Sequence, residues 1–220
     1  MSPTVGLIIP VKRLDQAKSR LWNGRLGARF DVRAAREDLV VAMALDTVEA
    51  ALAAEAVAQV LIVTTDPRSF ERLQDLDVKL MIDADSGGLN AALRLGAREM
   101  RNAFPHLQLG ALNADLPALL PADLDAAIRE SADRRSYCAD REGRGTTLLL
   151  AARTGDLRPH FGANSALAHR ASAARPLLGS WPSLRRDVDT VDDLDAAVAL
   201  GVGARTSAAL GLVHTGTTRP

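Results

Sequence analysis

Short apolar segments rich in Val and Ile alternate with longer segments of helical periodicity along most of the 220 residues. Residues 4–10 (TVGLIIP) and 56–66 (AVAQVLIVTTD) have the length and the β-branched composition of buried strands. Between them, residues 31–54 place apolar side chains at the spacing of a long helix. Strands that alternate with helices of this length form βαβ units, so the sequence predicts an α/β fold with a mainly parallel sheet flanked by helices.

The same alternation continues to residue 200, and the length favours a single domain. Residues 203–220 are rich in Gly, Ser, Thr and Ala and lack an apolar period, so we expect a domain at 1–202 and a flexible C-terminal tail at 203–220. The remaining expected strands are 78–83, 107–115, 134–140, 145–152 and 184–190, and the remaining expected helices are 68–76, 87–103, 122–131, 164–174 and 191–200.

Composition excludes several classes of protein. The formal net charge is zero, whereas nucleic-acid binders usually carry a basic excess. The single cysteine, Cys138, excludes a disulfide framework and a cysteine-based zinc site. No apolar run approaches the roughly 18 residues of a membrane helix, and the N-terminal apolar stretch is too short for a signal peptide. We therefore expect a cytoplasmic protein with small-molecule partners and neither a nucleic-acid nor a membrane partner; no feature of the sequence indicates an oligomeric state.

In open α/β sheets, ligands bind beyond the carboxyl ends of the strands. The first strand is followed by a basic stretch that contains Lys12, Arg13 and Lys18. Such side chains offset phosphate charge and donate hydrogen bonds, although a solvated basic loop would look the same. The chain has neither the GxxxxGK[ST] pattern of a P-loop nor the GxGxxG pattern of a dinucleotide-binding domain.

After the third strand, Gly87, Gly88 and Asn90 open a helix. Glycines let a backbone approach a ligand closely, and the Asn90 amide can donate to and accept from a base edge or a ribose. The alternative is an ordinary turn and helix start, where Gly and Asn are also favoured.

Aspartates crowd the segment 184-LRRDVDTVDDLDAAVALG-201. Residues two apart in a strand share a face, so Asp187 and Asp189 would point the same way, with Val188 opposite. Together with Asp115, at the end of the fourth strand, they would form a site of oxygen ligands suited to Mg²⁺, which would remove their mutual repulsion. The alternative is that these aspartates only keep the surface soluble.

The other aspartates of this segment have a separate explanation. Thr190, followed three positions later by Asp193, resembles a capping box at the start of the last helix. Acidic residues in the first helical turn, such as Asp192, are also favoured by the helix dipole. The segment is therefore interpreted as two metal ligands followed by a helix start.

Two further loops hold small and hydroxyl-bearing residues beside a strand or a helix start. Backbone amides at a helix N-terminus bind anions, so a small phosphorylated carboxylic acid could lie between these loops, although an N-cap alone would explain the second. His169 falls about one turn into the helix, where we expect a partly buried polar residue rather than a catalyst. The loop residues are Gly145, Thr146, Thr147, Gly162, Asn164 and Ser165.

Six segments of the chain, spanning about residues 5–202, occur in an order that resembles the 2-phospho-L-lactate guanylyltransferase family. Its bacterial members are described as phosphoenolpyruvate guanylyltransferases, which serve biosynthesis of the deazaflavin coenzyme F-420. The resemblance implies a single-domain, Rossmann-like nucleotidyltransferase fold of the nucleotide-diphospho-sugar transferase type. The segments are GLIIPVKRLDQAKSRL, GGLNAAL, NADLPAL, ADREGRGTT, FGANSALAHR and DVDTVDDL.

The resemblance also implies a reaction: Mg²⁺-dependent transfer of GMP from GTP to phosphoenolpyruvate, with release of pyrophosphate. The same reaction on 2-phospho-L-lactate or 3-phosphoglycerate stays open. By the family pattern, Asp115, Asp187 and Asp189 hold Mg²⁺ and, with Lys12, carry catalysis. The family pattern implies that the acceptor acid or its phosphate is contacted by Lys12, Thr146, Gly162 and Ser165, and we add Thr147 to this set. It also implies that the guanosine lies near Gly87, Gly88 and Asn90, and we expect the rest of the nucleotide to be contacted by Lys12, Arg13 and Lys18.

One departure from related nucleotidyltransferases concerns the first loop, which is usually rich in glycine. In this chain it reads PVKRLDQAKSRL, so Lys and Arg side chains would replace some backbone amide contacts to the triphosphate.

Two other classes of function remain open. A sugar-phosphate nucleotidyltransferase or glycosyltransferase could have the same fold, but sugar pockets are commonly aromatic, and only 3% of this chain is aromatic. A non-enzymatic nucleotide-binding module is the other possibility, and it would not depend on the three carboxylates for turnover.

Overall fold

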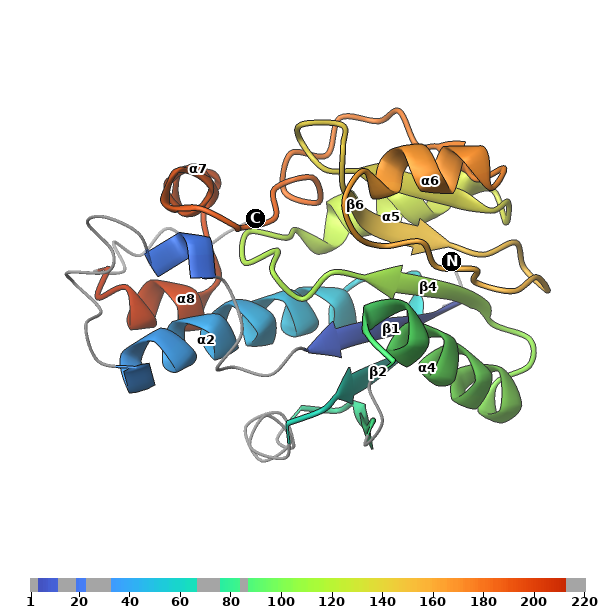
Figure 1. The fold of residues 1–220 in the computed structure, drawn as a ribbon, viewed down its shortest axis with the longest axis horizontal. Coiled ribbons are helices and arrows are strands. Elements are labelled where there is room, and N and C mark those ends of the chain that lie inside the picture. Colours follow the sequence, from blue (N-terminus) through green and yellow to red (C-terminus); the bar gives the residue numbers. More distant parts are fainter. Residues whose placement is uncertain (1–3, 12–18, 23–32, 67–75, 84–86, 213–220) are drawn as a thin grey trace.

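A computed structural model describes residues 4–11, 19–22, 33–66, 76–83 and 87–212. Its centre is a seven-stranded sheet with the strand order β3-β2-β1-β4-β6-β5-β7 (Figure 1). The strands are β1 (Val5–Val11), β2 (Val57–Thr64), β3 (Lys79–Ile82), β4 (Gln108–Leu112), β5 (Ser136–Ala139), β6 (Thr146–Leu150) and β7 (Arg175–Pro176).

The sheet is mainly parallel, as expected. β1 pairs in parallel with β2 on one side and β4 on the other, so Ile8 lies opposite both Leu61 and Ala111. β2 and β3 are also parallel, as are β5 and β7. β6 runs antiparallel to both of its neighbours, β4 and β5. This reversal brings the N-terminal end of β6 beside the carboxyl end of β4.

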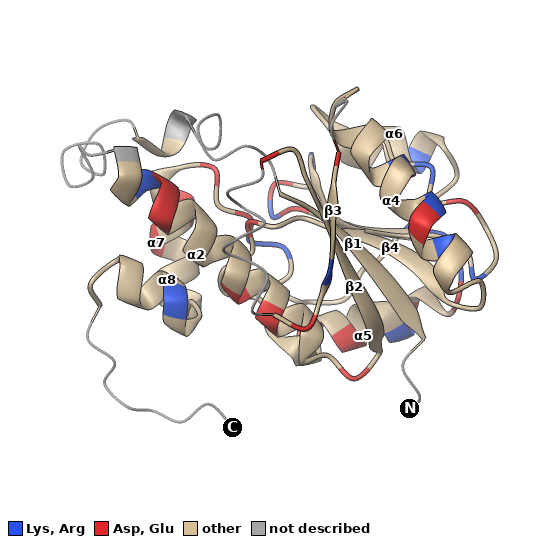
Figure 2. Cartoon of the chain, turned by 90° about the horizontal axis from the view of Figure 1, so that it is seen from below, with Lys and Arg blue, Asp and Glu red and all other residues tan. Residues whose placement is uncertain are grey.

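Helices cover both faces of the sheet (Figure 2). α2 and α5 pack against one face, and α4 and α6 pack against the other. α7 and α8 lie beside the N-terminal half of α2, away from the sheet (Figure 1). The helices are η2 (Ser19–Trp22, a 3-10 turn), α2 (Arg33–Leu52), α4 (Leu89–Ala103), α5 (Pro121–Ser131), α6 (Ser165–Ala171), α7 (Val191–Leu200) and α8 (Ala204–Ala209).

Alternate residues of the central strand, β1, point into the two cores on opposite faces of the sheet. Leu7 packs in the core under α2 and α5, whereas its neighbour Ile8 packs in the core under α4. Both side chains are fully buried. Gly96 lets α4 approach closely, because a β-carbon there would lie 2.8 Å from Ile8 and 2.9 Å from Val63. The period of two in the β1 sequence thus places an apolar side chain on each face of the sheet.

The C-terminal segment differs from the flexible tail expected from residue 203. Residues 204–209 form helix α8, which packs on α2, and Leu210 is buried in the cluster between them. The Asp46 carboxylate on α2 accepts hydrogen bonds from the backbone N–H groups of Arg205 and Thr206, at 3.1 and 2.8 Å. Tertiary capping from α2 therefore stabilises a helix that lacks a recognisable apolar period of its own. Residues 213–220 lie outside the described residues.

Two further elements expected from the sequence are a strand at 184–190 and a helix at 68–76. Residues 184–190 do not form a strand; their backbone is irregular, with a turn at 182–184 and bends at 189–190. The helix expected at 68–76 lies almost entirely outside the described residues. In the part of the chain that the structure describes, no helix is long and apolar enough to span a bilayer.

Candidate active site

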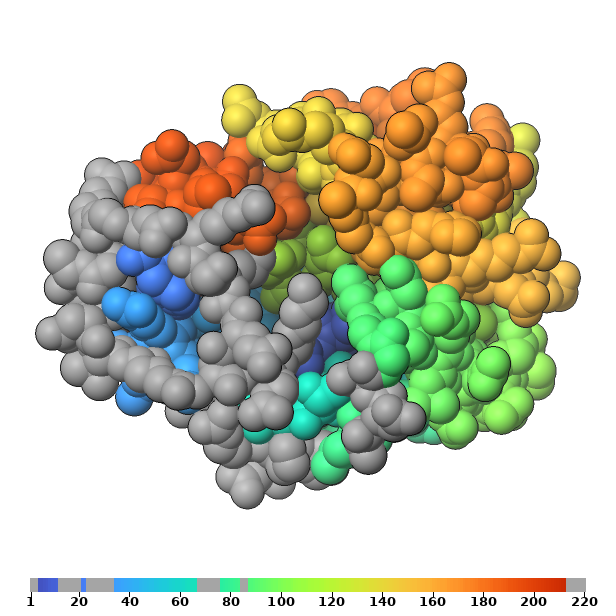
Figure 3. Space-filling view, viewed as in Figure 1, coloured from blue at the N-terminus to red at the C-terminus, as the bar shows by residue number. Residues whose placement is uncertain are grey.

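A cavity of about 640 Å³ opens at the carboxyl ends of β1 and β4. These two neighbours are where the chain order reverses across the sheet, the position at which open α/β sheets bind ligands. Pro10 and Val11 from β1 line the cavity, as do residues 113–115 after β4. In the space-filling view, the segment after β4 is recessed between the orange and red C-terminal segments and the start of α4 (Figure 3). This volume is in the range of small-molecule sites.

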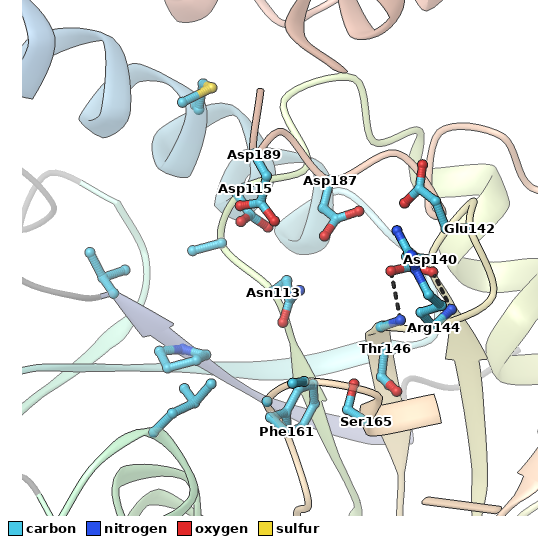
Figure 4. Close-up of a pocket in the computed structure, with 18 of the residues that line it drawn as sticks. Asn113, Asp115, Asp140, Glu142, Arg144, Thr146, Phe161, Ser165, Asp187 and Asp189 are labelled. Atoms are coloured by element: carbon cyan, nitrogen blue, oxygen red, sulfur yellow. Dashed lines mark hydrogen bonds between the residues drawn. The ribbon is translucent and has the colours of Figure 1, made fainter. Parts of the chain in front are cut away.

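One side of the cavity, the acidic wall, is formed by Asp115, Asp187 and Asp189. The backbone N–H of Val188 donates to the Asp115 carbonyl oxygen at 3.1 Å, which joins two segments more than 70 residues apart. Val188 itself is fully buried in the cluster with α7 and α8. The two flanking carboxylates therefore face the cavity beside Asp115 (Figure 4). The expected alternation is present, although the backbone is not a strand.

The capping box predicted at the start of α7 is confirmed. The Asp193 backbone N–H donates to Thr190 Oγ1 at 3.3 Å, and the Thr190 N–H donates to the Asp193 carboxylate at 3.0 Å. Asp193 also lies 3.5 Å from the Arg186 guanidinium. Asp193 is thus occupied by the helix start, whereas Asp187 and Asp189 face the cavity.

The lining is strongly acidic. Among the described lining residues, five carboxylates (those of Asp115, Asp140, Glu142, Asp187 and Asp189) face one basic side chain, that of Arg144. No three His, Cys, Asp or Glu side chains of the described segments are close enough to form a ready-made metal cluster. Mg²⁺ usually takes one or two carboxylates and keeps waters and substrate phosphates as its other ligands. A divalent ion at these carboxylates would therefore need waters or substrate phosphates as its other ligands.

The opposite side, the loop wall, consists of residues 140–146 and 160–165. The Asp140 carboxylate accepts from the backbone N–H groups of Arg144 and Gly145, at 2.9 and 2.6 Å (Figure 4). A β-carbon on Gly145 would collide with that carboxylate, so the loop needs glycine there. The N–H of Ala166 donates to the Arg144 carbonyl oxygen at 3.0 Å and links the two loops.

His169 stands behind the loop wall and is fully buried. Its Nδ1 lies 2.9 Å from Thr146 Oγ1, and its Nε2 accepts from the His160 backbone N–H at 3.0 Å. Burial lowers the pKa of His169 to about 4, and the charge of Arg135 adds to this effect. The ring is therefore neutral near pH 7. Thr146 and Ser165 lie at the edge of the cavity (Figure 4).

The side chain of Asn90, which was expected near the guanosine, makes hydrogen bonds within the protein. Its side-chain amide pairs with the Phe161 backbone, donating to the carbonyl oxygen and accepting from the N–H, both at 2.8 Å. It is not among the lining residues of the cavity, and neither are Gly87 and Gly88, which are exposed at the start of α4. The tertiary structure uses Asn90 to hold the loop wall in place.

Thr147 also departs from expectation. It is fully buried, its hydroxyl points to the Cys138 carbonyl oxygen at 3.5 Å, and it is not among the lining residues. Successive residues of β6 point to opposite faces, so only one of the two threonines can reach the cavity. Thr146, Gly162 and Ser165 all line it.

Several lining residues were not singled out from the sequence: Asn113, Asp140, Glu142, Arg144 and Phe161. All of them belong to the segments NADLPAL, ADREGRGTT and FGANSALAHR, which carry the family resemblance. Their presence in these segments was the only indication in the sequence that they line the site. The basic residues Lys12, Arg13 and Lys18 lie outside the described residues, directly after Val11 in the chain.

Solved structures with the same fold include nucleotidyltransferases. A nucleotidyl transferase from Methanothermobacter superposes with a TM-score of 0.58 at 18% identity, covering 90% of this chain and 97% of that one. A Mycobacterium tuberculosis protein crystallised with manganese superposes with a TM-score of 0.55 at 21% identity, covering 90% of this chain and 100% of that one. At these identities the likeness concerns the fold, a single α/β nucleotidyltransferase domain.

Sequence comparison gives a closer relationship. Phosphoenolpyruvate guanylyltransferase of Streptomyces coelicolor is 47% identical over 204 residues, which cover 92% of this chain and 93% of the relative. The enzyme of the same name from Salinispora arenicola is 46% identical over 204 residues and 91% of each chain. The family model "Guanylyl transferase CofC like" matches residues 5–210, which include α8. This chain therefore belongs to the CofC-like guanylyl transferase family.

Proposed function

We propose that this chain transfers the GMP group of GTP to phosphoenolpyruvate and releases pyrophosphate, with the help of a divalent cation. One observation carries the proposal: the acidic wall and the loop wall face each other across a single cavity at the switch point of the sheet. Phosphoenolpyruvate is the acceptor acid because relatives at 46–47% identity bear its name. The product would enter biosynthesis of the deazaflavin coenzyme F-420, the role implied by the family.

The reaction exchanges one phosphorus–oxygen bond for another. A phosphate oxygen of the acceptor bonds to the α-phosphorus of GTP, and the bond from that phosphorus to the β-phosphate oxygen breaks. Pyrophosphate leaves with the electron pair. The acceptor phosphate is already anionic near pH 7, so the protein needs no general base. Positioning and charge neutralisation are left as its main contributions.

Charge balance supports a divalent cation in this site. Two highly anionic substrates must enter a cavity whose described lining holds five carboxylates and one arginine. Asp115, Asp187 and Asp189 are the side chains that would hold the ion, directly or through its waters. When bound, Mg²⁺ or Mn²⁺ would neutralise charge on the triphosphate. Lys12, Arg13 and Lys18 follow a cavity-lining residue in the chain, and we assign them the remaining triphosphate charge.

The loop wall suits the acceptor acid. Thr146 and Ser165 bring hydroxyl groups to the cavity, and Gly162, at a φ of 136°, leaves its backbone open to close approach by a ligand. Thr147 is left out of this proposal because it faces the core. Gly87 and Gly88 remain our candidates for the guanosine, since they are exposed at the start of α4.

A pyrophosphate-release assay tests the proposal. Each of the four ribonucleoside triphosphates is paired with phosphoenolpyruvate, 2-phospho-L-lactate and 3-phosphoglycerate, with Mg²⁺ present. We expect turnover to be fastest with GTP and phosphoenolpyruvate, to stop with excess EDTA, and to return with Mg²⁺ or Mn²⁺. Absence of turnover in every pairing would refute the guanylyltransferase activity, and full turnover in EDTA would refute the metal requirement.

A further inference from the structure

His169 touches two different parts of the loop wall through its two ring nitrogens. Nε2 accepts the backbone N–H of His160 at 3.0 Å, and Nδ1 lies 2.9 Å from the hydroxyl oxygen of Thr146. The Phe161 ring also packs against it, with the ring planes at 75° and the ring centroids 5.1 Å apart. A fully buried ring held on three sides has one orientation available.

The backbone contact decides which nitrogen carries the proton. A backbone N–H can only donate, so Nε2 must be the unprotonated, accepting nitrogen. In a neutral imidazole the proton is then on Nδ1. The low pKa of His169 agrees with a neutral ring near pH 7. Nδ1–H therefore donates to Thr146 Oγ1, and the hydroxyl oxygen is the acceptor in that contact.

This assignment determines what the Thr146 hydroxyl can do. Its oxygen accepts from His169, so its own hydrogen must point elsewhere, and no other hydrogen bond of Thr146 Oγ1 occurs within the described segments. Thr146 lines the cavity. The opposite tautomer would draw the hydroxyl hydrogen back toward the ring and leave only lone pairs facing an anionic ligand, which would repel it.

We propose that His169 is a positioning residue that holds the Thr146 hydroxyl as a hydrogen-bond donor toward an anionic oxygen of the acceptor acid. The proposal rests on the proposed function for the identity of that ligand. A donor fixed in advance loses no rotational freedom when the substrate binds, and a neutral side chain adds no charge that would hold the product. His169 itself does not touch the substrate.

Two substitutions at residue 169 separate the two contacts. His169→Asn can keep a donor near the Nδ1 position, whereas His169→Gln can keep an acceptor near the Nε2 position and loses the donor. We expect His169→Gln to raise the KM for phosphoenolpyruvate about 10-fold, the size of a hydrogen bond to a charged group, with the KM for GTP nearly unchanged. His169→Asn should recover most of that loss.

A double-mutant cycle then asks whether His169 acts through Thr146. Thr146→Val should raise the KM for phosphoenolpyruvate by about 10- to 100-fold, and Thr146→Ser, which keeps a hydroxyl, should raise it less. In the Thr146→Val background, His169→Gln should have no further effect on this KM. Additive effects, or equal effects on the KM values of both substrates, would show a purely structural role and overturn the proposal.

The tautomer of the wild-type ring provides a test that needs neither turnover nor a variant that folds. Long-range ¹H–¹⁵N correlation spectra at pH 7 distinguish protonated from unprotonated ring nitrogens, and the chain has four histidines to assign. We expect a protonated Nδ1 and an unprotonated Nε2 in His169. A protonated Nε2 would refute the positioning role, whatever the outcome of the pyrophosphate-release assay.

Discussion

The two walls of the cavity are built in different ways. Hydrogen bonds within the protein hold the loop wall: Asp140 caps two of its amides, Asn90 pairs with Phe161, and His169 joins His160 to Thr146. The acidic wall instead consists of three carboxylates on two segments of irregular backbone. The hydrogen bond from the Val188 N–H to the Asp115 carbonyl oxygen joins these segments. The loop wall is therefore held by internal contacts, and under the proposed function the acidic wall would be completed by a cation.

The largest effect is expected in the acidic wall. Asp189→Asn should lower kcat/KM by about 100-fold or more, because it removes one carboxylate that would hold the cation, a loss comparable to that of one electrostatic contact at a reacting centre. Its unfolding temperature should stay close to that of the wild type, because Asp189 is exposed and asparagine has nearly the same size. Thermal unfolding and steady-state kinetics check both points.

The control for this variant is Asp192→Asn, which removes an exposed aspartate three positions away that does not line the cavity. It should retain wild-type turnover. Full activity of Asp189→Asn would exclude Asp189 from the proposed metal site and contradict the assignment of the cation to the acidic wall.

A smaller effect on rate, with a loss of stability, is expected in the loop wall. Asp140→Ala removes the acceptor of two backbone N–H groups, so we expect the free energy of unfolding to fall by about 1–3 kcal/mol and the KM for the acceptor acid to rise about 10-fold. Urea unfolding and initial-rate kinetics measure the two quantities. Asp156→Ala, at an exposed position outside the cavity, is the matched control. An unchanged stability would show that the loop wall is not preorganised by Asp140.

Asn90, which does not line the cavity, also tests whether hydrogen bonds within the protein preorganise the loop wall. Asn90→Ala frees the backbone of Phe161, and we expect the acceptor KM to rise about 3-fold and the free energy of unfolding to fall by about 1–2 kcal/mol. Asn102→Ala, at an exposed position of the same helix, should change neither value. If Asn90→Ala instead raised the KM for GTP selectively, Asn90 would be a nucleotide contact after all.

The smallest effect concerns pH and stability rather than turnover. Burial lowers the pKa of His169 from 6.5 to about 4, so the unfolded chain binds more protons than the folded chain between those two values. The free energy of unfolding should therefore decrease as the pH falls from 6.5 toward 4, by up to about 1.4 kcal/mol per pH unit from this residue.

Above pH 6.5 the contribution of His169 should be constant. The difference between the wild type and His169→Gln, followed by urea unfolding from pH 4 to 8, isolates this term from the titration of the carboxylates. If the difference in free energy of unfolding between the two proteins did not vary with pH, the pKa of His169 would be the same in the folded and unfolded chains. The side of the loop wall that holds His169 would then be accessible to water.

The sequence alone determined the features that depend on neighbours along the chain. Apolar runs with a period of two or of about 3.6 predicted most of the strands and helices, and Thr190 with Asp193 predicted the start of α7. The alternation in 187-DVD-189 predicted two carboxylates on one side with a valine opposite, even though no strand forms there. Such patterns are readable because backbone geometry relates residues two to four positions apart in a constant way.

Only the tertiary structure decided which distant groups meet. Asn90 pairs with a residue 71 positions away, and Asp46 caps α8 across about 160 positions, so neither partner could be identified from local spacing. Thr146 reached the cavity and Thr147 did not, because the pairing of β6 with β4 set which face of the strand is turned toward it. Contacts of this kind depend on the order of the strands in the sheet and on where the long connections between them end. The strand order and these end points are fixed only when the two cores pack.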